Sequence, residues 1–124
     1  MKTSSADSTR TKGIRAESVA AQWLEAQGYC IVEKNFTCKL GEIDLIARHG
    51  GELVFVEVRS RHGAEALDPV YSVDFRKRKK IIRTAQVYLS GRFAVPPACR
   101  FDVVIVTLGP PLLVQVIADA FCLE

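Results

Sequence analysis

The segment from Gly41 to Arg61 restricts the fold most strongly, because it has the pattern of two apolar strands joined by a tight turn. At its centre is Gly50-Gly51, a dipeptide typical of two-residue hairpin loops. The residues that follow, Leu53 to Val56, form an unbroken apolar run, which is typical of a strand covered on both faces of a sheet. The sequence therefore predicts a β-hairpin whose second strand lies inside a sheet.

Each predicted strand carries one acidic residue of interest, Asp44 in the first and Glu57 in the second. Side chains alternate between the two faces of a strand. If the two glycines form the whole loop, His49 pairs with Glu52 and Asp44 lies directly opposite Glu57, with their Cβ atoms about 5 Å apart. A four-residue loop over 48–51 would make the two acids diagonal neighbours on one face. A slip of one residue would separate them, but it would also turn the apolar side chains of the second strand the wrong way.

Two ionised carboxylates this close repel each other unless a cation or a hydrogen-bond donor compensates. Mg²⁺ takes oxygen ligands and commonly uses one or two carboxylates together with water and substrate phosphates. We therefore predict that Asp44 and Glu57 bind Mg²⁺ or Mn²⁺. Arg59 points to the same face and could hold a phosphate oxygen or stabilise a pentacovalent transition state. The alternative is that both acids lie on the solvated face of an antiparallel sheet, although the apolar run before Glu57 favours a covered strand.

Residues 73–91 have the pattern of a helix with an apolar stripe, and the first half of this segment is strongly basic. Six cations in eight positions weaken a helix by mutual repulsion unless anions are near, and a phosphate backbone would supply them. The simpler interpretation is a solvated helix face, and a further one is a surface that binds an acidic protein. The predicted nucleic-acid-binding residues are Arg76, Lys77, Lys79, Lys80 and Arg83.

The remaining elements complete an α/β pattern of helix, three strands, helix and two strands. The basic helix is long enough to cross over, so the strand after it can pair in parallel with the strand that carries Glu57. We predict a flexible tail over 1–12 and one domain over 13–124 with a mixed sheet flanked by helices. The other predicted segments are a helix at 13–27, strands at 29–36, 100–108 and 112–118, a loop at 61–75, a linker at 92–99 and a tail at 119–124.

Composition is ordinary for a globular domain of 124 residues, with 48% hydrophobic and 25% charged residues and a net charge of +3. No apolar run approaches the roughly 18 residues of a membrane span, and no secretory signal is visible. The four cysteines, at 30, 38, 99 and 122, lack metal-binding spacing, so we expect buried or neutral thiols in a reducing cytoplasm. Asp102 lies in an apolar strand, where we expect a structural pairing with Arg100 or Arg92 rather than catalysis.

Four motifs taken together resemble the YraN family of predicted endonucleases, in the PD-(D/E)xK superfamily of restriction-endonuclease-like nucleases. They are Gly-Glu-Ile-Asp-Leu-Ile, Val-Phe-Val-Glu-Val-Arg, Arg-Phe-Asp-Val-Val and the final Ala-Phe, and the resemblance covers residues 13–121. It implies a restriction-endonuclease-like αβββαβ core and Mg²⁺-dependent hydrolysis of phosphodiester bonds in nucleic acid, DNA before RNA. The implied catalytic residues are Glu17, Asp44, Glu57 and Arg59, with Glu17 a third ligand of the metal or of water. A first-turn acid stabilised by the helix dipole is the alternative for Glu17.

Two residues depart from the superfamily motif. Ile43 stands where the motif has Pro, which is a common variation, and Arg59 stands where it has Lys. Arg is effectively never deprotonated, so Arg59 can bind phosphate but cannot exchange a proton with the attacking water. The alternative function is therefore a non-catalytic nucleic-acid-binding protein with a nuclease-like fold. The resemblance also implies that Lys80 faces the site, and a junction-cutting role would require a twofold homodimer.

Overall fold

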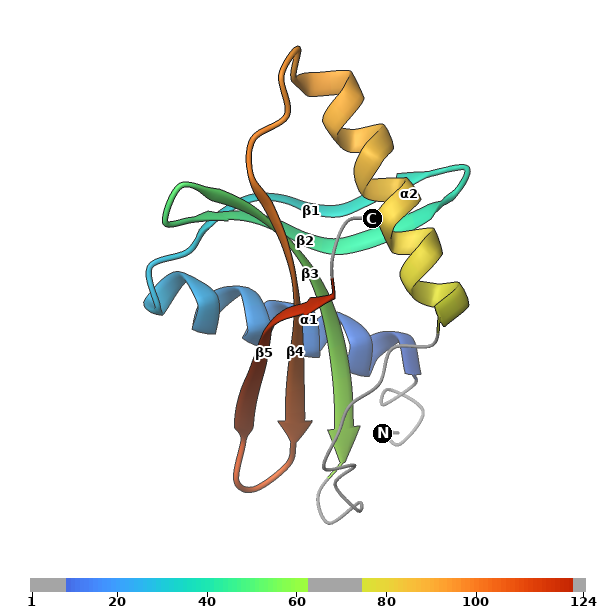
Figure 1. Ribbon diagram of the computed structural model, residues 1–124. Helices are drawn as coiled ribbons and strands as arrows, with labels where there is room; N and C mark the ends of the chain where they lie inside the picture. The colour runs from blue at the N-terminus through green and yellow to red at the C-terminus, as the bar shows by residue number, and fades with distance from the viewer. Residues whose placement is uncertain (1–8, 63–74, 122–124) are drawn as a thin grey trace.

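The computed structural model describes residues 9–62 and 75–121, which form two helices and one five-stranded sheet. Figure 1 shows how these elements are arranged. The predicted order of helix, three strands, helix and two strands is confirmed. In chain order the elements are α1 (Thr9–Ala26), β1 (Cys30–Cys38), β2 (Gly41–His49), β3 (Glu52–His62), α2 (Phe75–Arg92), β4 (Cys99–Leu108) and β5 (Leu113–Phe121).

The sheet is mixed, and its strands follow the chain order from β1 to β5. Strand β3 pairs in parallel with β4, whereas the other neighbouring pairs are antiparallel. The segment containing α2 connects the two parallel strands, as a parallel pair requires a crossover connection. Both the central position of β3 and its parallel pairing with β4 are therefore as predicted.

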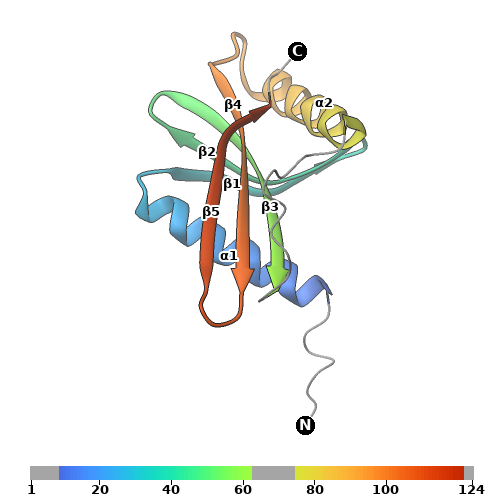
Figure 2. The ribbon, with the colours of Figure 1, turned by 60° about the horizontal axis from the view of Figure 1, so that its bottom comes forward.

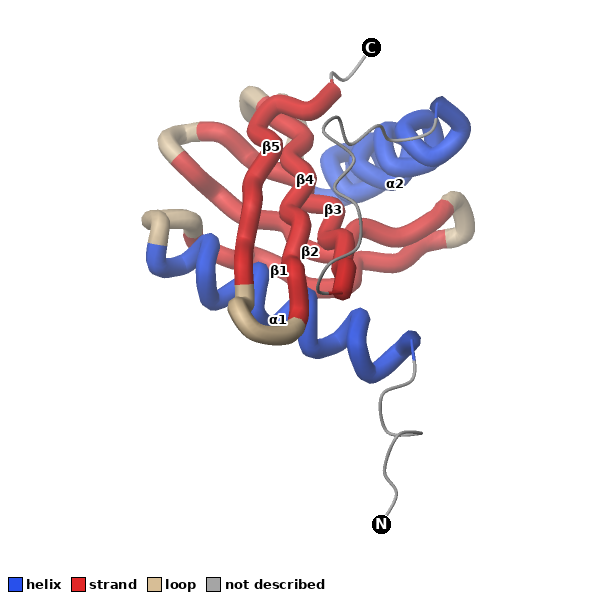
Figure 3. Tube along the Cα trace, turned by 90° about the horizontal axis from the view of Figure 1, so that it is seen from below, coloured by secondary structure: helices blue, strands red, loops and turns tan. Residues whose placement is uncertain are grey.

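The two helices cover opposite faces of the sheet, and Figures 2 and 3 show strands passing between them. Alternate residues of β3 account for the two apolar layers: Val54 and Val56 pack on the α1 side, and Leu53 and Phe55 pack on the α2 side. A strand that is covered on both faces needs apolar residues at every position. This explains the unbroken apolar run of β3.

The β2–β3 hairpin has the predicted two-residue loop. His49 lies opposite Glu52, and Gly50 and Gly51 have φ angles of 58° and 86°. Two successive positive φ angles characterise a type I′ turn, whose twist matches that of the flanking strands and which Gly adopts without steric cost. This turn fixes the register that brings Asp44 to the level of Glu57.

Several predicted boundaries were wrong, including the end of the first strand, which runs to Cys38 rather than residue 36. Helix α1 begins at Thr9, so the last four residues of the predicted tail are helical. The polar start of this helix carries no apolar period that would mark it in the sequence. Strand β3 continues through His62, because it stays paired with β4 as far as Leu108, and β5 continues to Phe121. The rest of the predicted tail (1–8), the rest of the loop (63–74) and the final residues 122–124 lie outside the described residues.

Neither helix in the described part of the chain combines the length and the apolar character that crossing a membrane requires.

Candidate active site

Strands β2 and β3 separate where the two acids lie. Their ladder runs from His49 and Glu52 to Leu45 and Val56. In a continued ladder the N–H of Val58 would donate to the carbonyl of Ile43. It donates instead to Oδ2 of Asp44 at 2.8 Å. The carboxylate of Asp44 thus replaces a main-chain acceptor at the point where the strands part.

Glu57 is covered by α2. Its side chain is only 11% exposed, and Lys77 Nζ lies 2.6 Å from its Oε2 atom. A nitrogen of the Arg59 guanidinium lies 3.9 Å from the same oxygen. The alternative that these acids form a solvated sheet face is therefore wrong, because the crossover helix packs over that face.

Asp44, Glu57 and Arg59 line one cavity of about 350 Å³ between the sheet and the start of α2. Lys77 and Lys80 close the cavity from the helix side. The structure thus brings three acids, including Glu42, and three cations to one opening. The complete lining is Gly41, Glu42, Asp44, Glu57, Val58, Arg59, Lys77, Lys80 and Ile81.

The entry of the chain into β2 lies close against α2. A Cβ atom at Gly41 would lie 3.0 Å from Oγ1 of Thr84, a distance tighter than ordinary van der Waals contact. Thr84 is fully buried, and its hydroxyl donates to the carbonyl of Lys80 at 2.7 Å. The glycine therefore lets β2 approach the helix turn that carries Lys80.

The pKa of Asp44 is raised from 3.8 to about 7. Burial is the largest cause, and the negative charges of Glu57, Glu17 and Glu42 act in the same direction. The hydrogen bond from Val58 lowers the pKa but does not offset these effects. Because burial and like charges both penalise the ionised form, a cation at this position would stabilise it.

Glu17 lies in an adjoining cavity of about 550 Å³, which shares Glu42 with the first. Its pKa is raised, chiefly by burial, and its charge contributes to the shift at Asp44. Glu17 is eight residues beyond the start of α1, and the first turn of that helix holds no acid. The helix-dipole alternative is therefore wrong. Over 9–62 and 75–121, no three His, Cys, Asp or Glu residues are grouped for metal binding, so a ligand role for Glu17 stays a prediction.

Asn35 lines the same cavity as Glu17 but was not identified as a site residue from the sequence. It has a φ of 54° inside β1, an uncommon conformation for a non-glycine residue. Its neighbours Lys34 and Phe36 pair with Leu45 and Ile43, so the register sets Asn35 opposite Asp44.

The side chain of Asn35 hydrogen-bonds Glu17 and opposes the upward shift of the pKa of that acid. Asn adopts the left-handed conformation more readily than most residues. In the sequence, the only indication of this conformation was an Asn within an otherwise strand-forming segment.

The five predicted nucleic-acid-binding residues lie on α2 but divide into two groups. Lys77 and Lys80 line the cavity, as predicted for Lys80, whereas the ion pair of Lys77 with Glu57 was not foreseen. Arg76, Lys79 and Arg83 are on the exposed side of the helix. The basic segment is therefore continuous with the candidate site and extends away from it.

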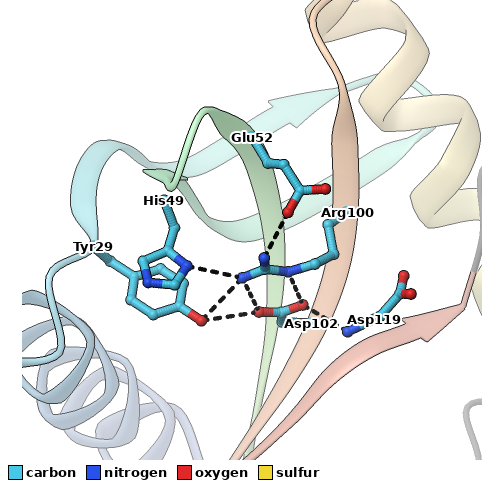
Figure 4. Close-up of polar contacts among 6 residues, drawn as sticks. All are labelled: Tyr29, His49, Glu52, Arg100, Asp102 and Asp119. Atoms are coloured by element: carbon cyan, nitrogen blue, oxygen red, sulfur yellow. Dashed lines mark hydrogen bonds and ion pairs between the residues drawn. The ribbon is translucent and has the colours of Figure 1, made fainter.

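A second polar cluster, drawn in Figure 4, centres on Asp102, which is buried. The guanidinium of Arg100 donates to both Asp102 oxygens, at 3.0 and 3.1 Å. The Tyr29 hydroxyl and the Asp119 N–H donate at 3.2 and 2.9 Å. The structural pairing of Asp102 with Arg100 is confirmed. Arg92 pairs elsewhere, with Glu33.

The three described cysteines, Cys30, Cys38 and Cys99, are free thiols, and none of them is buried. The expectation was of buried or neutral thiols. It is not met as regards burial, but partial burial raises the pKa of the Cys99 thiol, which favours its neutral form. Cys30 and Cys38 are the first and last residues of β1, whereas Cys99, the first residue of β4, is partly buried against the apolar layer on the α2 side.

Comparison with known proteins gives one family. Residues 16–106 match the family described as "Uncharacterised protein family UPF0102". A UPF0102 protein of Caldanaerobacter subterraneus subsp. tengcongensis is 45% identical over 104 residues, which cover 84% of this chain and 85% of the relative. One from Hahella chejuensis is 46% identical over 109 residues (88% of each chain), and one from Symbiobacterium thermophilum is 44% identical over 115 residues (91% and 98%). From this match and these identities, the chain belongs to the UPF0102 family.

Proposed function

We propose that the protein is a metal-dependent endonuclease that hydrolyses phosphodiester bonds in nucleic acid, DNA before RNA. The observation that carries this proposal is the shared cavity, where Asp44 and Glu57 lie beside Arg59, Lys77 and Lys80. Paired carboxylates suit a hard divalent cation, and the adjacent cations suit a phosphate. An acidic substrate and a cationic cofactor thus each have a matching set of side chains.

The residues present fit Mg²⁺ or Mn²⁺. Asp44 would supply a buried oxygen ligand. Burial and the neighbouring acids disfavour its ionised form, so a bound cation would stabilise the ionised carboxylate electrostatically. Glu57 supplies a second oxygen ligand, and water and substrate phosphate complete the usual coordination of these ions. When bound, such a cation supplies an activated water and stabilises charge on the scissile phosphate.

Lys77 could perform the proton exchange with water that Arg59 cannot perform. A lysine ammonium can give up a proton, whereas a guanidinium effectively cannot. Lys77 Nζ already lies 2.6 Å from Glu57, inside the cavity, although it comes from α2 rather than from β3. We assign to Lys77 the proton exchange with water that a strand lysine would perform, and to Arg59 the binding of a phosphate oxygen.

The resemblance to the YraN family and to the PD-(D/E)xK superfamily supports the proposal. The order α1, β1, β2, β3, α2, β4 corresponds to the αβββαβ core that this resemblance implies. The acids of the motif, Asp44 and Glu57, both line the cavity. On the outer side of α2, Arg76, Lys79 and Arg83 would hold the nucleic-acid backbone, which predicts binding that weakens steeply with salt.

The second candidate is a protein of the same fold that binds nucleic acid without cutting it. The replacement of the motif lysine by Arg59 favours it. The two candidates share the basic surface and differ in the need for Lys77. If Lys77 only neutralises Glu57, the parent will bind metal and nucleic acid but will show no turnover.

The test is cleavage of a panel of end-labelled substrates with Mg²⁺ or Mn²⁺: duplex, single strand, flap and four-way junction in DNA, with matching RNA. We compare the parent with Asp44→Asn, Glu57→Gln and Lys77→Ala, and with Glu25→Gln on exposed α1 as a matched charge control. We expect loss of cutting of at least about a hundredfold in the first three, the scale of general acid–base and electrostatic contributions, and none in the control. Cutting that survives in both Asp44→Asn and Glu57→Gln, or a parent without metal-dependent cutting, would contradict the proposal.

A further inference from the structure

An exposed aromatic residue begins the basic helix. Phe75, the first residue of α2, is 62% exposed, whereas the apolar face of this helix is formed by Ile81, Ala85, Tyr88 and Leu89. Burial in the core therefore does not account for Phe75. A large exposed aromatic ring on a helix that is otherwise strongly basic calls for a ligand with an apolar face and negative charge.

Two cations accompany the ring. Lys79 Nζ lies 5.0 Å from the ring centroid of Phe75, and Arg78 Cζ lies 5.8 Å from it. Both distances are within the range of a cation–π contact. Lys79 remains exposed at the same time, so the ring and a positive charge are offered together to solvent.

The cations also link this ring to the cavity. At about 100° per residue, Lys80, Arg76, Arg83, Lys79 and Phe75 follow one another around α2 in steps of about 40° or less. Lys80 lines the cavity, and Arg76, Arg83 and Lys79 are exposed. A positively charged arc thus leads from the two acids over the outer side of the helix and ends at the aromatic ring.

We infer that Phe75 is a stacking platform for an unpaired nucleobase of a strand whose phosphates lie along this arc. Aromatic rings beside a positively charged track are the usual means of binding single strands without reading sequence, because every base has a π face. Bases inside a duplex are already stacked and cannot use the ring. The inference deepens the proposed function and rests on it: the substrate class is nucleic acid with unpaired nucleotides next to the cut, such as a single strand, flap or junction.

Binding is measured without cutting, by fluorescence anisotropy in EDTA, with oligo(dT), oligo(U) of equal length and a blunt DNA hairpin closed by a non-nucleotide linker, so that every base is paired. The variants are Phe75→Ala, Phe75→Leu and Phe75→Trp. Because one base stacked on an aromatic ring contributes roughly five- to a hundredfold in affinity, we expect Phe75→Ala and Phe75→Leu to weaken oligo(dT) binding roughly tenfold. Phe75→Trp should bind at least as tightly as the parent, and hairpin binding should be unchanged in all three. Equal losses on oligo(U) would extend the platform to RNA.

Two controls separate stacking from other effects. Val87→Ala removes an apolar side chain that is 39% exposed on the same helix and should leave binding unchanged. The salt dependence of Phe75→Ala should match that of the parent because no charge is lost, whereas Lys79→Ala should reduce the slope by about one. Trp23 is the only tryptophan of the chain, so quenching by oligo(dT) that appears only in Phe75→Trp would report a base on the ring.

Three results would overturn the platform: a Phe75→Ala variant that binds oligo(dT) as the parent does, a Phe75→Leu variant that retains full affinity, or a parent that prefers the blunt hairpin to single strands. None of these depends on turnover. The nuclease proposal fails by a different result: the parent shows no metal-dependent cutting, or such cutting survives in Asp44→Asn.

Discussion

Replacing the central acid of the candidate site should stabilise the fold. Asp44 has a pKa of about 7 in the folded protein against 3.8 as its ordinary value, and burial is the main cause. Between these two values the folded state retains a proton that the unfolded chain has lost, so stability falls as the pH rises through this interval. The difference of roughly three pH units corresponds to about 4 kcal/mol once both states are ionised. Asp44→Asn has no ionisation to oppose.

The variant isolates this effect because an amide oxygen can still accept the hydrogen bond from Val58, which is 2.8 Å from the carboxylate of Asp44. We expect Asn at this position to raise the free energy of unfolding by about 4 kcal/mol at pH 8, by about 2 kcal/mol at pH 5 and by almost nothing at pH 3. The assay is urea unfolding of the metal-free protein, followed by circular dichroism at each pH. Glu25→Gln, on an exposed turn of α1, is the matched control and should change stability little at any pH.

A gain that is equal at every pH would refute the reasoning, because it would come from packing rather than from ionisation. A loss of stability at pH 8 would refute it as well, and would mean that the ionised carboxylate of Asp44 is already compensated within the protein. The expected pattern is typical of a functional residue that is kept at a cost to stability.

Three further predictions follow from the same geometry. Calorimetry should show that the apparent affinity for Mn²⁺ falls up to tenfold per pH unit below about pH 7, because the cation must displace the proton of Asp44. An affinity that does not depend on pH would contradict this prediction. Asn35→Ala should be about 1 kcal/mol less stable in urea than Asn35→Gly, because only glycine adopts the φ of 54° without strain; equal stability would show that this position is not strained. In both variants an NMR titration should give a higher pKa for Glu17, because the hydrogen bond from Asn35 is lost. Asp102→Ala should cost about 3–5 kcal/mol in the same assay, because it removes the buried carboxylate that accepts from Arg100, Tyr29 and the Asp119 N–H and leaves Arg100 with only its partly exposed ion pair to Glu52. Arg92→Ala, at an exposed pair, should cost about 1 kcal/mol or less, and similar costs would rule out a buried network.

The hairpin could be predicted because its determinants are local. Gly50-Gly51 selects the turn, the turn fixes the register, and strand parity then sets Asp44 and Glu57 on one face. The continuous apolar run of β3 likewise indicated a strand with both faces covered, which in turn required a helix on each side. The parallel pairing of β3 with β4 followed from the length of the crossover segment.

The residues that sequence analysis missed depend on how elements meet. Lys77 contacts Glu57 only because of the angle and rotation at which α2 crosses the sheet, and a run of six cations does not indicate which of them turns inward. Asn35 matters through its backbone conformation, which residue types alone do not reveal. The start of α1 was predicted too late because its first turns are polar and carry no apolar stripe.

The position of the cavity follows from the topology. Because β3 and β4 are parallel, the connecting helix must return along the sheet, and its first turns lie over the face that carries Glu57. On the other side of this position, β2 parts from β3, so the acid of β2 accepts a main-chain hydrogen bond in place of the ladder. The same crossover therefore covers the acids, raises the pKa of Asp44 by burial and brings Lys77 and Lys80 against them. An arrangement that buries the Asp44 carboxylate among other acids, and places Lys77 and Lys80 at the same cavity, is better suited to binding a cation and a phosphate than to supporting the fold. The polar pairing that supports the fold is made elsewhere, by Asp102 and Arg100.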